Sequence, residues 1–418
     1  MFLKSTSKKT TVLIISQVYV PDPASVGQHL HDLARELTHQ NKRVIVFTPR
    51  GGYDDPSCKY AWHQTIDGVK VIRLPFCAFG KKLVIWRLLS GISLTIQSML
   101  LGIFIRNLTH VLVSTIPPMS AIAACFIGLF KRIKIVFWAM DINPDQLIAL
   151  DKISTTSVIA KICDSVNSLI LSSVDFIVTL DEYMGKRLIS KVNKNIKLQQ
   201  KLHIIPPWPY ENQLVSIDHE ANHFRKDNAL DGKFVVMYSG NITSVHPIDT
   251  LLEAILRLRK NKHIVFLFIG SELACKKLKL FTYKNSLTNL RTLPYVPFNE
   301  TQYSLSAADL HIVSMGNNLV GIVHPCKVYG IMSVGRPFLA FGPKRSHVGE
   351  ILESASVGWL VEHGDVDGTV KILEKVSLFP KKELASMGAV GQNLIKQKYS
   401  HNVLCHKFCQ FFEDVSSS

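Results

Sequence analysis

The same succession of predicted elements occurs twice along the chain, and it limits the folds that this sequence can adopt. Residues 11–16 (Thr-Val-Leu-Ile-Ile-Ser) are a short apolar, β-branched run that is typical of a buried parallel strand. A proline-containing loop follows, apolar residues then recur at helical spacing over 30–37, and residues 43–48 form another apolar run. This order predicts a strand, a loop, a helix and a second strand.

The unit restarts in mid-chain. Residues 233–239 predict a strand, Gly240 and Asn241 a turn, residues 251–258 the apolar face of a helix, and residues 264–269 the following strand. Strands that alternate with helices indicate parallel sheets covered on both faces. Two restarts therefore predict an α/β protein with two Rossmann-like domains.

The length of 418 residues suits two domains of roughly 200 residues each. The proline-dense stretch at 204–210 is expected to open the linker between them. We place the N-terminal domain at 1–208 and the C-terminal domain at 218–396, and we expect the helix within 397–418 to return to the first domain. Ligands of parallel sheets bind beyond the carboxyl ends of the strands, so two facing domains would form a deep cleft there.

The charge balance points to an anionic partner. The formal net charge is +16, which favours nucleic acid, a membrane surface or phosphorylated small molecules, with a simple solubility role as the alternative. The sequence contains no basic-aromatic cluster and no nucleic-acid motif, so we expect no nucleic-acid partner.

The cysteines indicate a reducing compartment and no metal site. All eight stand singly, without a Cys-x2-Cys pair, and residues 1–11 lack the apolar stretch of a signal peptide, so we expect a cytoplasmic protein. Cys405, Cys409 and His401 fall one helical turn apart, which would suit a metal. A helix that buries small thiols explains the same spacing, and we expect no metal cofactor.

Residues 88–105 form an uncharged stretch of 18 residues between Arg87 and Arg106. This is the minimum length of a membrane span. The stretch contains several serines and lies between two predicted strands of one sheet, which a true span would place on opposite sides of a bilayer. We therefore expect a crossover helix, buried or resting on a membrane, with a transmembrane helix as the alternative.

The strongest local signal lies at residues 321–337. A loop that begins with Gly321 leads to Pro325, which suits a helix start, and Gly335 and Pro337 end the predicted helix. Such a loop presents free backbone amides to a phosphate. Lys327 in the first turn opposes the helix dipole, so an anionic ligand would explain it, whereas a solvent-facing lysine is the alternative.

Four motifs resemble the retaining glycosyltransferases of family 4, of the bacterial polysaccharide-biosynthesis type. They are Ser239-Gly240-Asn241 with His246-Pro247, Pro325-Cys-Lys327-Val-Tyr329 with Gly335-Arg336-Pro337, a glycine loop over 21–29 that contains Gly27, and residues 138–145, which contain Asp141. The resemblance covers nearly the whole chain and implies the GT-B fold of two facing Rossmann-like domains.

The resemblance also implies roles for individual residues. The diphosphate of a nucleotide-sugar donor would be held by Gly240, Asn241, His246, Gly321, His324 and Lys327. Gly27 would let the backbone approach the donor, and Asp141 would face the sugar or the acceptor hydroxyl. The departing phosphate would help to deprotonate the acceptor, so no metal ion is needed and the protein positions groups and neutralises charge.

The implied substrates are a nucleotide-diphosphate-sugar and a lipid-linked or glycan acceptor, and the basic charge suits peripheral contact with the anionic inner face of the cell membrane. Two alternatives stay open: a nucleotide-sugar epimerase of the same fold, and a non-catalytic nucleotide- or sugar-binding relative.

The sequence departs from the family pattern at the donor loop. Ile322 and Gly330 occupy the positions of two glutamates in many relatives, and Asn241 and His246 replace an arginine and a lysine. These changes leave the identity of the donor sugar undetermined. They also remove expected positive charge near the phosphates, which makes Lys327 more important for binding them. Asp141 has its own alternative, because an aspartate before Asn-Pro often only forms a turn.

Overall fold

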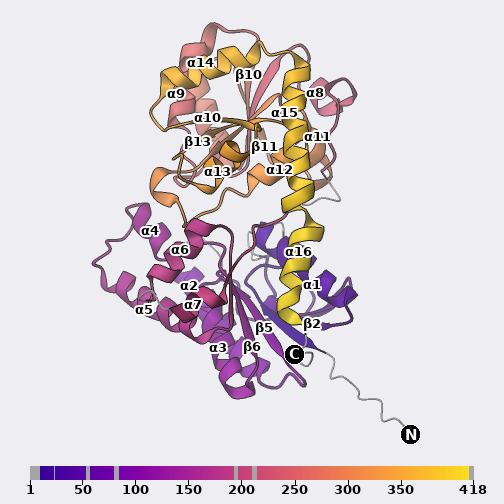
Figure 1. The fold of residues 1–418 in the computed structure, drawn as a ribbon, viewed down its shortest axis with the longest axis vertical. Helices are drawn as coiled ribbons and strands as arrows, with labels where there is room; N and C mark the ends of the chain where they lie inside the picture. The colour runs from indigo at the N-terminus through magenta and orange to yellow at the C-terminus, as the bar shows by residue number, and fades with distance from the viewer. Residues whose placement is uncertain are drawn as a thin grey trace. The chain divides into compact units, whose positions relative to one another are not determined.

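The computed structural model describes residues 10–22, 24–52, 57–79, 84–192, 196–209 and 214–413. The chain divides into two compact units (Figure 1). The first comprises Met1–Pro206 with Leu404–Ser418, and the second comprises Pro207–Val403. Each unit is an α/β domain built around one sheet, as the alternation of strands and helices predicts.

The first unit contains a sheet in the order β3-β4-β2-β1-β5-β6-β7-β8, parallel throughout except that β3 runs antiparallel to β4. Its central strands are buried along their whole length, which explains their continuous apolar sequences. The strands are β1 (Thr11–Ile15), β2 (Arg43–Pro49), β3 (His63–Ile66), β4 (Val69–Leu74), β5 (His110–Ser114), β6 (Lys134–Trp138), β7 (Phe176–Thr179) and β8 (Leu202–Ile204).

The helices of the first unit connect these strands. They are α1 (Ser25–His39), α2 (Val84–Gly102), α3 (Ser120–Lys131), α4 (Asp145–Ala149), α5 (Val158–Ser173), α6 (Glu182–Ser190) and α7 (Ile196–Lys201). The predicted helix over 88–105 is α2, and it begins and ends a few residues earlier than expected. Since α2 joins β4 to β5 within one sheet, it is a crossover helix.

The last helix, α16 (His401–Cys409), carries the chain from the second unit to the first. Its Phe408 ring lies 4.7 Å from the ring of Trp138 on β6, measured between centroids. Phe412, in the short 3-10 turn that follows, packs against His110 on β5 at 5.5 Å. These buried aromatic contacts fix residues after 404 on the first sheet.

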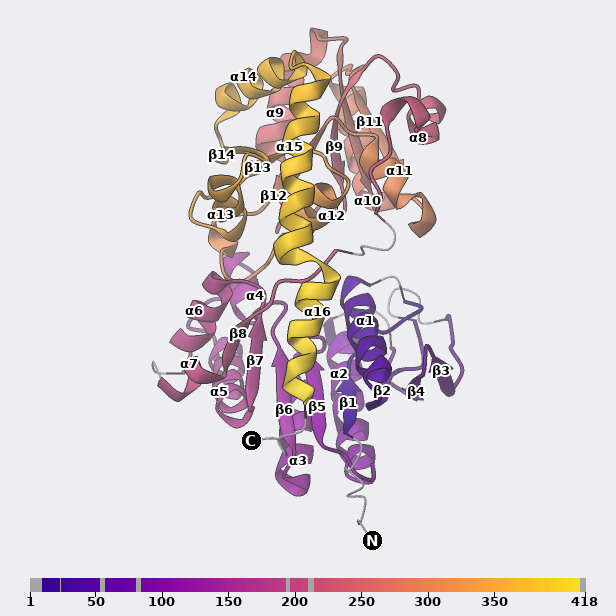
Figure 2. The ribbon, with the colours of Figure 1, turned by 45° about the vertical axis from the view of Figure 1, so that its right-hand side comes forward.

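The second unit contains a parallel sheet in the order β11-β10-β9-β12-β13-β14. Its strands are β9 (Phe234–Ser239), β10 (Ile264–Gly270), β11 (Leu290–Pro294), β12 (Leu310–Ser314), β13 (Phe338–Phe341) and β14 (Gly358–Val361). Its helices are α8 (His223–Asp227), α9 (Asp249–Arg257), α10 (Glu272–Lys284), α11 (Thr301–Ser306), α12 (Lys327–Ser333), α13 (His347–Ser354), α14 (Val366–Ser377) and α15 (Lys381–Leu394). Figure 2 shows α9 and α14, which pack against each other.

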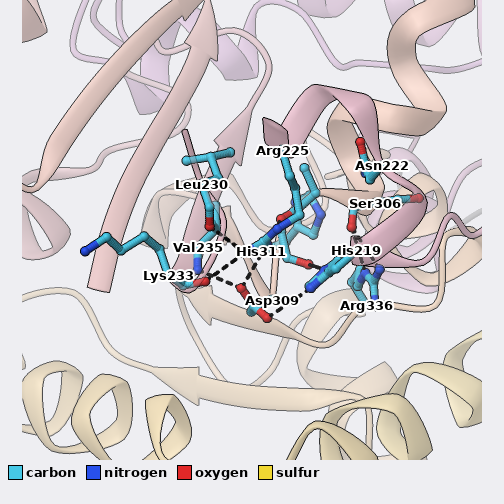
Figure 3. A network of polar contacts seen from close by, with 12 residues as sticks. His219, Asn222, Arg225, Leu230, Lys233, Val235, Ser306, Asp309, His311 and Arg336 are labelled. Atoms are coloured by element: carbon cyan, nitrogen blue, oxygen red, sulfur yellow. Dashed lines mark hydrogen bonds and ion pairs between the residues drawn. The ribbon is translucent and has the colours of Figure 1, made fainter. Parts of the chain in front are cut away.

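A buried polar network fastens α8 to the second sheet (Figure 3). Arg225 Nη1 donates to the Ala307 carbonyl at 2.6 Å and lies 3.3 Å from Asp309 Oδ2, while its Nη2 donates to the carbonyls of Leu230 and Lys233 at 2.8 Å each. Every donor of this kind that is buried needs an acceptor. The guanidinium therefore ties the loop before β9 to the end of α11.

Arg336, from the Gly-Arg-Pro motif, belongs to the same region of the second unit (Figure 3). Its Nη2 donates to the carbonyls of Ser306 at 2.8 Å and Ile217 at 3.0 Å. Asp309 also accepts the backbone N–H of Val235 at 2.8 Å. The motif arginine thus has a structural task, because it anchors the segment before α8.

Candidate functional site

The most unusual group in the second unit is the ammonium of Lys327, the first residue of α12. Its Nζ is buried and has no hydrogen-bond partner among the residues that the structure describes. It lies 3.8 Å from the centroid of the Tyr238 ring on β9. A Cβ added to Gly240 would stand 3.2 Å from Nζ, so the ammonium lies directly against the glycine that follows β9.

This position is costly for a positive charge. Burial lowers the pKa of Lys327 to about 7, because removal from water disfavours the charged form and the Tyr238 ring replaces little of the lost hydration. An anion at this point would stabilise the ammonium. The buried Nζ contradicts the solvent-facing alternative, and anion binding by Lys327 stays a prediction.

His246 lies in the same site. Its Nδ1 is 2.7 Å from the carbonyl oxygen of Ser314 at the end of β12, so Nδ1 carries the proton and donates. Burial, with the nearby charge of Lys327 as a second cause, lowers the pKa of His246 to about 4. The ring is therefore neutral near pH 7, and Nε2 would donate to a phosphate only after the ring takes up a proton.

Two glycines shape the loops around this site. Gly240 has φ of 130° and Gly321 has φ of 71°, both in the region that side chains disfavour. Tyr238 Oη donates to the carbonyl of Asn241 at 2.8 Å, which holds the turn after β9, while the Asn241 side chain is exposed. The turn is thus fixed by Tyr238, the residue that also faces Lys327.

His324 lies elsewhere in the loop. Its side chain is buried, and its Nε2 is 2.8 Å from the Tyr329 hydroxyl, which is in turn 2.8 Å from Nε2 of His347. The structure thus brings Lys327, Gly240 and His246 together, whereas the His324 ring belongs to a separate buried network. At the two departure positions, Ile322 is fully buried and Gly330 is half-buried.

A pocket of about 450 Å³ in the second unit is lined by residues that include Pro247, the residue after His246. Sequence reasoning missed it, because the two carboxylates in its lining occupy the first turns of α9, where acidic residues commonly face solvent. Carboxylates and an asparagine can bind the hydroxyl groups of a polyol. The lining consists of Pro247, Asp249, Thr250, Glu253, Gly316, Asn317, His363, Gly364 and Val366.

In the first unit, Asp141 follows β6 and lines a small cavity of about 30 Å³ with Thr115 and Asn167. Its Oδ1 is buried and has no hydrogen-bond partner within the described part of the chain. Burial raises the pKa of Asp141 above its usual value. Such a carboxyl group is suited to accept or donate a proton.

Asp145, four residues further, has a different environment. Its carboxylate is paired with Arg187 Nε at 2.7 Å and with Lys191 Nζ at 2.5 Å. These ion pairs tie α4 to α6 and to Lys191, the residue that follows it, so Asp145 has a structural role that Asp141 does not share.

Gly27 lies on α1, where the helix approaches the loop after β1. A Cβ at this position would stand 3.0 Å from the Cα of Tyr19, which is closer than side chains tolerate. The glycine therefore allows backbone-to-backbone packing inside the first unit. No group of three or more His, Cys, Asp or Glu that could hold a metal is found among the residues that the structure describes.

The segment that contains the Lys327 site is similar to known glycosyltransferases. Residues 220–393 match the family Glycosyl transferases group 1. That segment includes Gly240, His246 and Lys327. The chain is 25% identical over 275 residues to the probable glycosyltransferase WbjE of Pseudomonas aeruginosa, covering 66% of this chain and 67% of that protein.

A second relative is the putative colanic acid biosynthesis glycosyl transferase WcaI of Escherichia coli, 23% identical over 235 residues, which is 54% of this chain and 56% of that protein. The fold matches the structure of HepE from Anabaena in complex with UDP and glucose, with a TM-score of 0.71 and 12% identity over 96% of this chain and 99% of that one. The fold is therefore GT-B. The epimerase alternative finds no support in these relatives.

Proposed function

We propose that this protein is a glycosyltransferase that moves a sugar from a nucleotide-diphosphate-sugar to an acceptor, with retention of configuration. One observation carries the proposal: the buried Nζ of Lys327 lies against Gly240, in the segment that matches the group 1 family, and no described residue hydrogen-bonds to it. A donor diphosphate would give this ammonium a negatively charged partner. The glycosyltransferase names of the relatives and the UDP bound to HepE support this assignment.

In the proposed reaction, Lys327 neutralises the diphosphate as the bond to the sugar breaks. The turn at Gly240 and Asn241 and the loop at Gly321 approach the same group, and His246 contributes a hydrogen bond once protonated. The departing phosphate takes the proton of the acceptor hydroxyl. Asp141 faces the acceptor or the sugar, and the reaction requires no metal ion.

The proposed acceptor is a lipid-linked sugar or a growing glycan, since WcaI is named for the biosynthesis of colanic acid. The protein would then act in the cytoplasm at the inner face of the cell membrane. The net charge of +16 favours peripheral contact with the anionic lipids there.

A second candidate, a relative that binds a nucleotide-sugar without transferring it, is favoured by one observation. Ile322 and Gly330 provide no carboxylate at the two positions where many family 4 enzymes carry glutamates. The pocket that contains Pro247 provides the carboxylates of Asp249 and Glu253. In a transferase these carboxylates would hydrogen-bond to the donor sugar during transfer, whereas in a binding protein the sugar would not be transferred.

Titration calorimetry with UDP, GDP, ADP and CMP tests the donor site. We expect one nucleotide to bind the wild type selectively, and Lys327→Met to weaken that binding by about 10- to 150-fold, or roughly 1.5–3 kcal/mol for a charge-assisted contact. Lys371→Met is the matched control, because Lys371 is an exposed lysine on α14 of the same unit and its loss should change nothing.

Equal nucleotide affinity in Lys327→Met and the wild type would remove Lys327 from the site. A folded protein that binds none of the four nucleotides would contradict the donor site itself. Selective binding without transfer to any acceptor from a donor carrying that base would favour the second candidate.

A further inference from the structure

Helix α2 has its polarity reversed relative to an ordinary surface helix. Apart from Leu94, which is fully buried, the side that packs on the first unit consists of small and polar residues: Ser90, Gly91, Thr95, Ser98 and Gly102. Two of these hydroxyls bond to the helix's own backbone, since Ser90 Oγ donates to the carbonyl of Trp86 at 2.8 Å and Thr95 Oγ1 to that of Gly91 at 2.8 Å.

The outward side of α2 is apolar. Only 33% of its 18-residue apolar window is buried. Apolar residues before and after the helix extend this surface, with Phe76 being 76% and Phe104 80% exposed. The large apolar side chains exposed on α2 are Ile85, Trp86, Leu88, Leu89, Ile92, Ile96, Leu100 and Leu101.

Helix α3 packs against α2. Gly102 lets α2 approach α3 closely, since a Cβ there would stand 2.4 Å from Cδ1 of Ile127. At the end of α3, Leu129 and Phe130 are exposed. We call these exposed residues of 76–104 together with Leu129 and Phe130 the α2–α3 face.

The charge around this face has one sign. Residues 68–140 contain no aspartate or glutamate, while Arg87, Arg106 and Arg132 are exposed. The neighbouring helix α5 contains one acidic residue, Asp164, and its carboxylate is paired with Lys191 at 2.6 Å. An apolar face with cations around it and no free anion fits a partner that is apolar with an anionic surface.

A lipid bilayer fits these properties better than a second copy of the chain does. Because β4 and β5 belong to one sheet, the two ends of α2 stay on one domain, which suits a helix lying along an interface. Trp86 and the phenylalanines are side chains that favour the headgroup region, and arginine stems reach from apolar surface to phosphate. In a symmetric pair of copies, each arginine cluster would meet its own equivalent.

We propose that the α2–α3 face docks on an anionic phospholipid bilayer and lies flat in its headgroup region. This rests on the proposed function only for its purpose, which is to bring a lipid-linked acceptor to the first unit. The docking itself does not depend on sugar transfer. It goes beyond the net positive charge of the chain, because it assigns membrane contact to the residues of the α2–α3 face.

Vesicle co-sedimentation of the full chain tests the docking, using phosphatidylcholine vesicles with and without phosphatidylglycerol. We expect the wild type to bind the mixed vesicles, and the double substitution Ile96→Ser with Leu100→Ser to weaken binding on the order of tenfold. Arg87→Gln with Arg106→Gln should weaken binding to a similar extent and reduce its salt dependence.

The matched control is Leu378→Ser, which removes a leucine that is 80% exposed in the second unit. It should bind vesicles like the wild type. The proposal is overturned if Ile96→Ser with Leu100→Ser binds as the wild type does, or if Leu378→Ser loses binding equally.

Two further outcomes are also decisive. Equal binding to vesicles without phosphatidylglycerol would contradict the anionic partner. A wild-type dimer in sedimentation velocity without lipid, abolished by Ile96→Ser with Leu100→Ser, would assign the face to a second copy of the chain. Nucleotide affinity of the same variants, measured in parallel, separates a failure of docking from a failure of the donor site.

Discussion

Asp141 and Lys327 place ionisable atoms out of water without a hydrogen-bond partner among the described residues. Burial acts on them in opposite directions, raising the pKa of the carboxyl and lowering that of the amine, because in both cases it disfavours the charged form. Groups of this kind weaken a fold. On the proposed function, the donor diphosphate would pair with Lys327, and the sugar or the acceptor hydroxyl would contact Asp141.

The substitution Asp141→Asn separates the effect of this carboxyl group on stability from its effect on sugar transfer. Since the folded-state pKa of Asp141 is raised, its ionisation costs stability as pH rises above about 3.8, the usual value. The asparagine removes that charge, so at pH 7 we expect an unchanged or higher melting temperature, unchanged nucleotide affinity and a transfer rate reduced about 100-fold or more. Calorimetry and a transfer assay measure these quantities. Full transfer activity in this variant would mean that Asp141 only forms a turn.

At the scale of elements, the strands were predictable and several side-chain environments were not. The apolar run at 264–269 lies within β10, and that at 11–16 contains β1, because a buried parallel strand leaves a continuous apolar signature. The serines of α2 argue in the sequence against a membrane span. In the structure they form the buried side of the helix, an orientation that depends on where α3 packs.

The candidate site was predictable to a similar degree. The glycine turn at Gly240 and the lysine at 327 stand out in the sequence, but the missing partner of Nζ depends on how β9 and α12 meet. The buried His324 ring hydrogen-bonds to Tyr329, and the pocket with Asp249 is lined by residues from three separate segments of the chain. None of these leaves a local pattern.

The network around α8 sets how firmly that helix is held. In Arg225→Ala, the carboxylate of Asp309 loses its buried cation and several carbonyls lose a donor, so we expect a loss of about 3–5 kcal/mol in the free energy of unfolding. Chemical denaturation measures it. Arg257→Ala is the control, because its ion pair with Asp367 is exposed and its loss should cost at most about 1 kcal/mol. Equal effects of the two substitutions would contradict the role of the network.

For the whole molecule, the buried histidines predict a response to acid. Burial lowers the pKa of His219, His246 and His311 to about 4 in each case. The unfolded chain then binds more protons than the folded one between pH of about 6.5 and 4, so stability falls as pH falls through that window. The slope is at most about 1.4 kcal/mol per pH unit for each histidine.

All three histidines belong to the second unit, so its unfolding transition should move to lower temperature first. Scanning calorimetry between pH 7 and 5 measures this shift, and His311→Gln should flatten the profile. A melting temperature that does not change over this range would contradict the expectation.

The reversed polarity of α2 also affects the solubility of this protein. On the proposed docking, a copy away from the bilayer exposes the tryptophan, phenylalanine and leucine side chains of the α2–α3 face to water, and mutual repulsion between cations opposes the association of such copies. High salt weakens that repulsion while it leaves the apolar attraction intact. On the proposed docking, the colloidal stability of the free protein would be set by ionic strength, and the amount that stays dispersed in a cell would depend on how much bilayer surface is available.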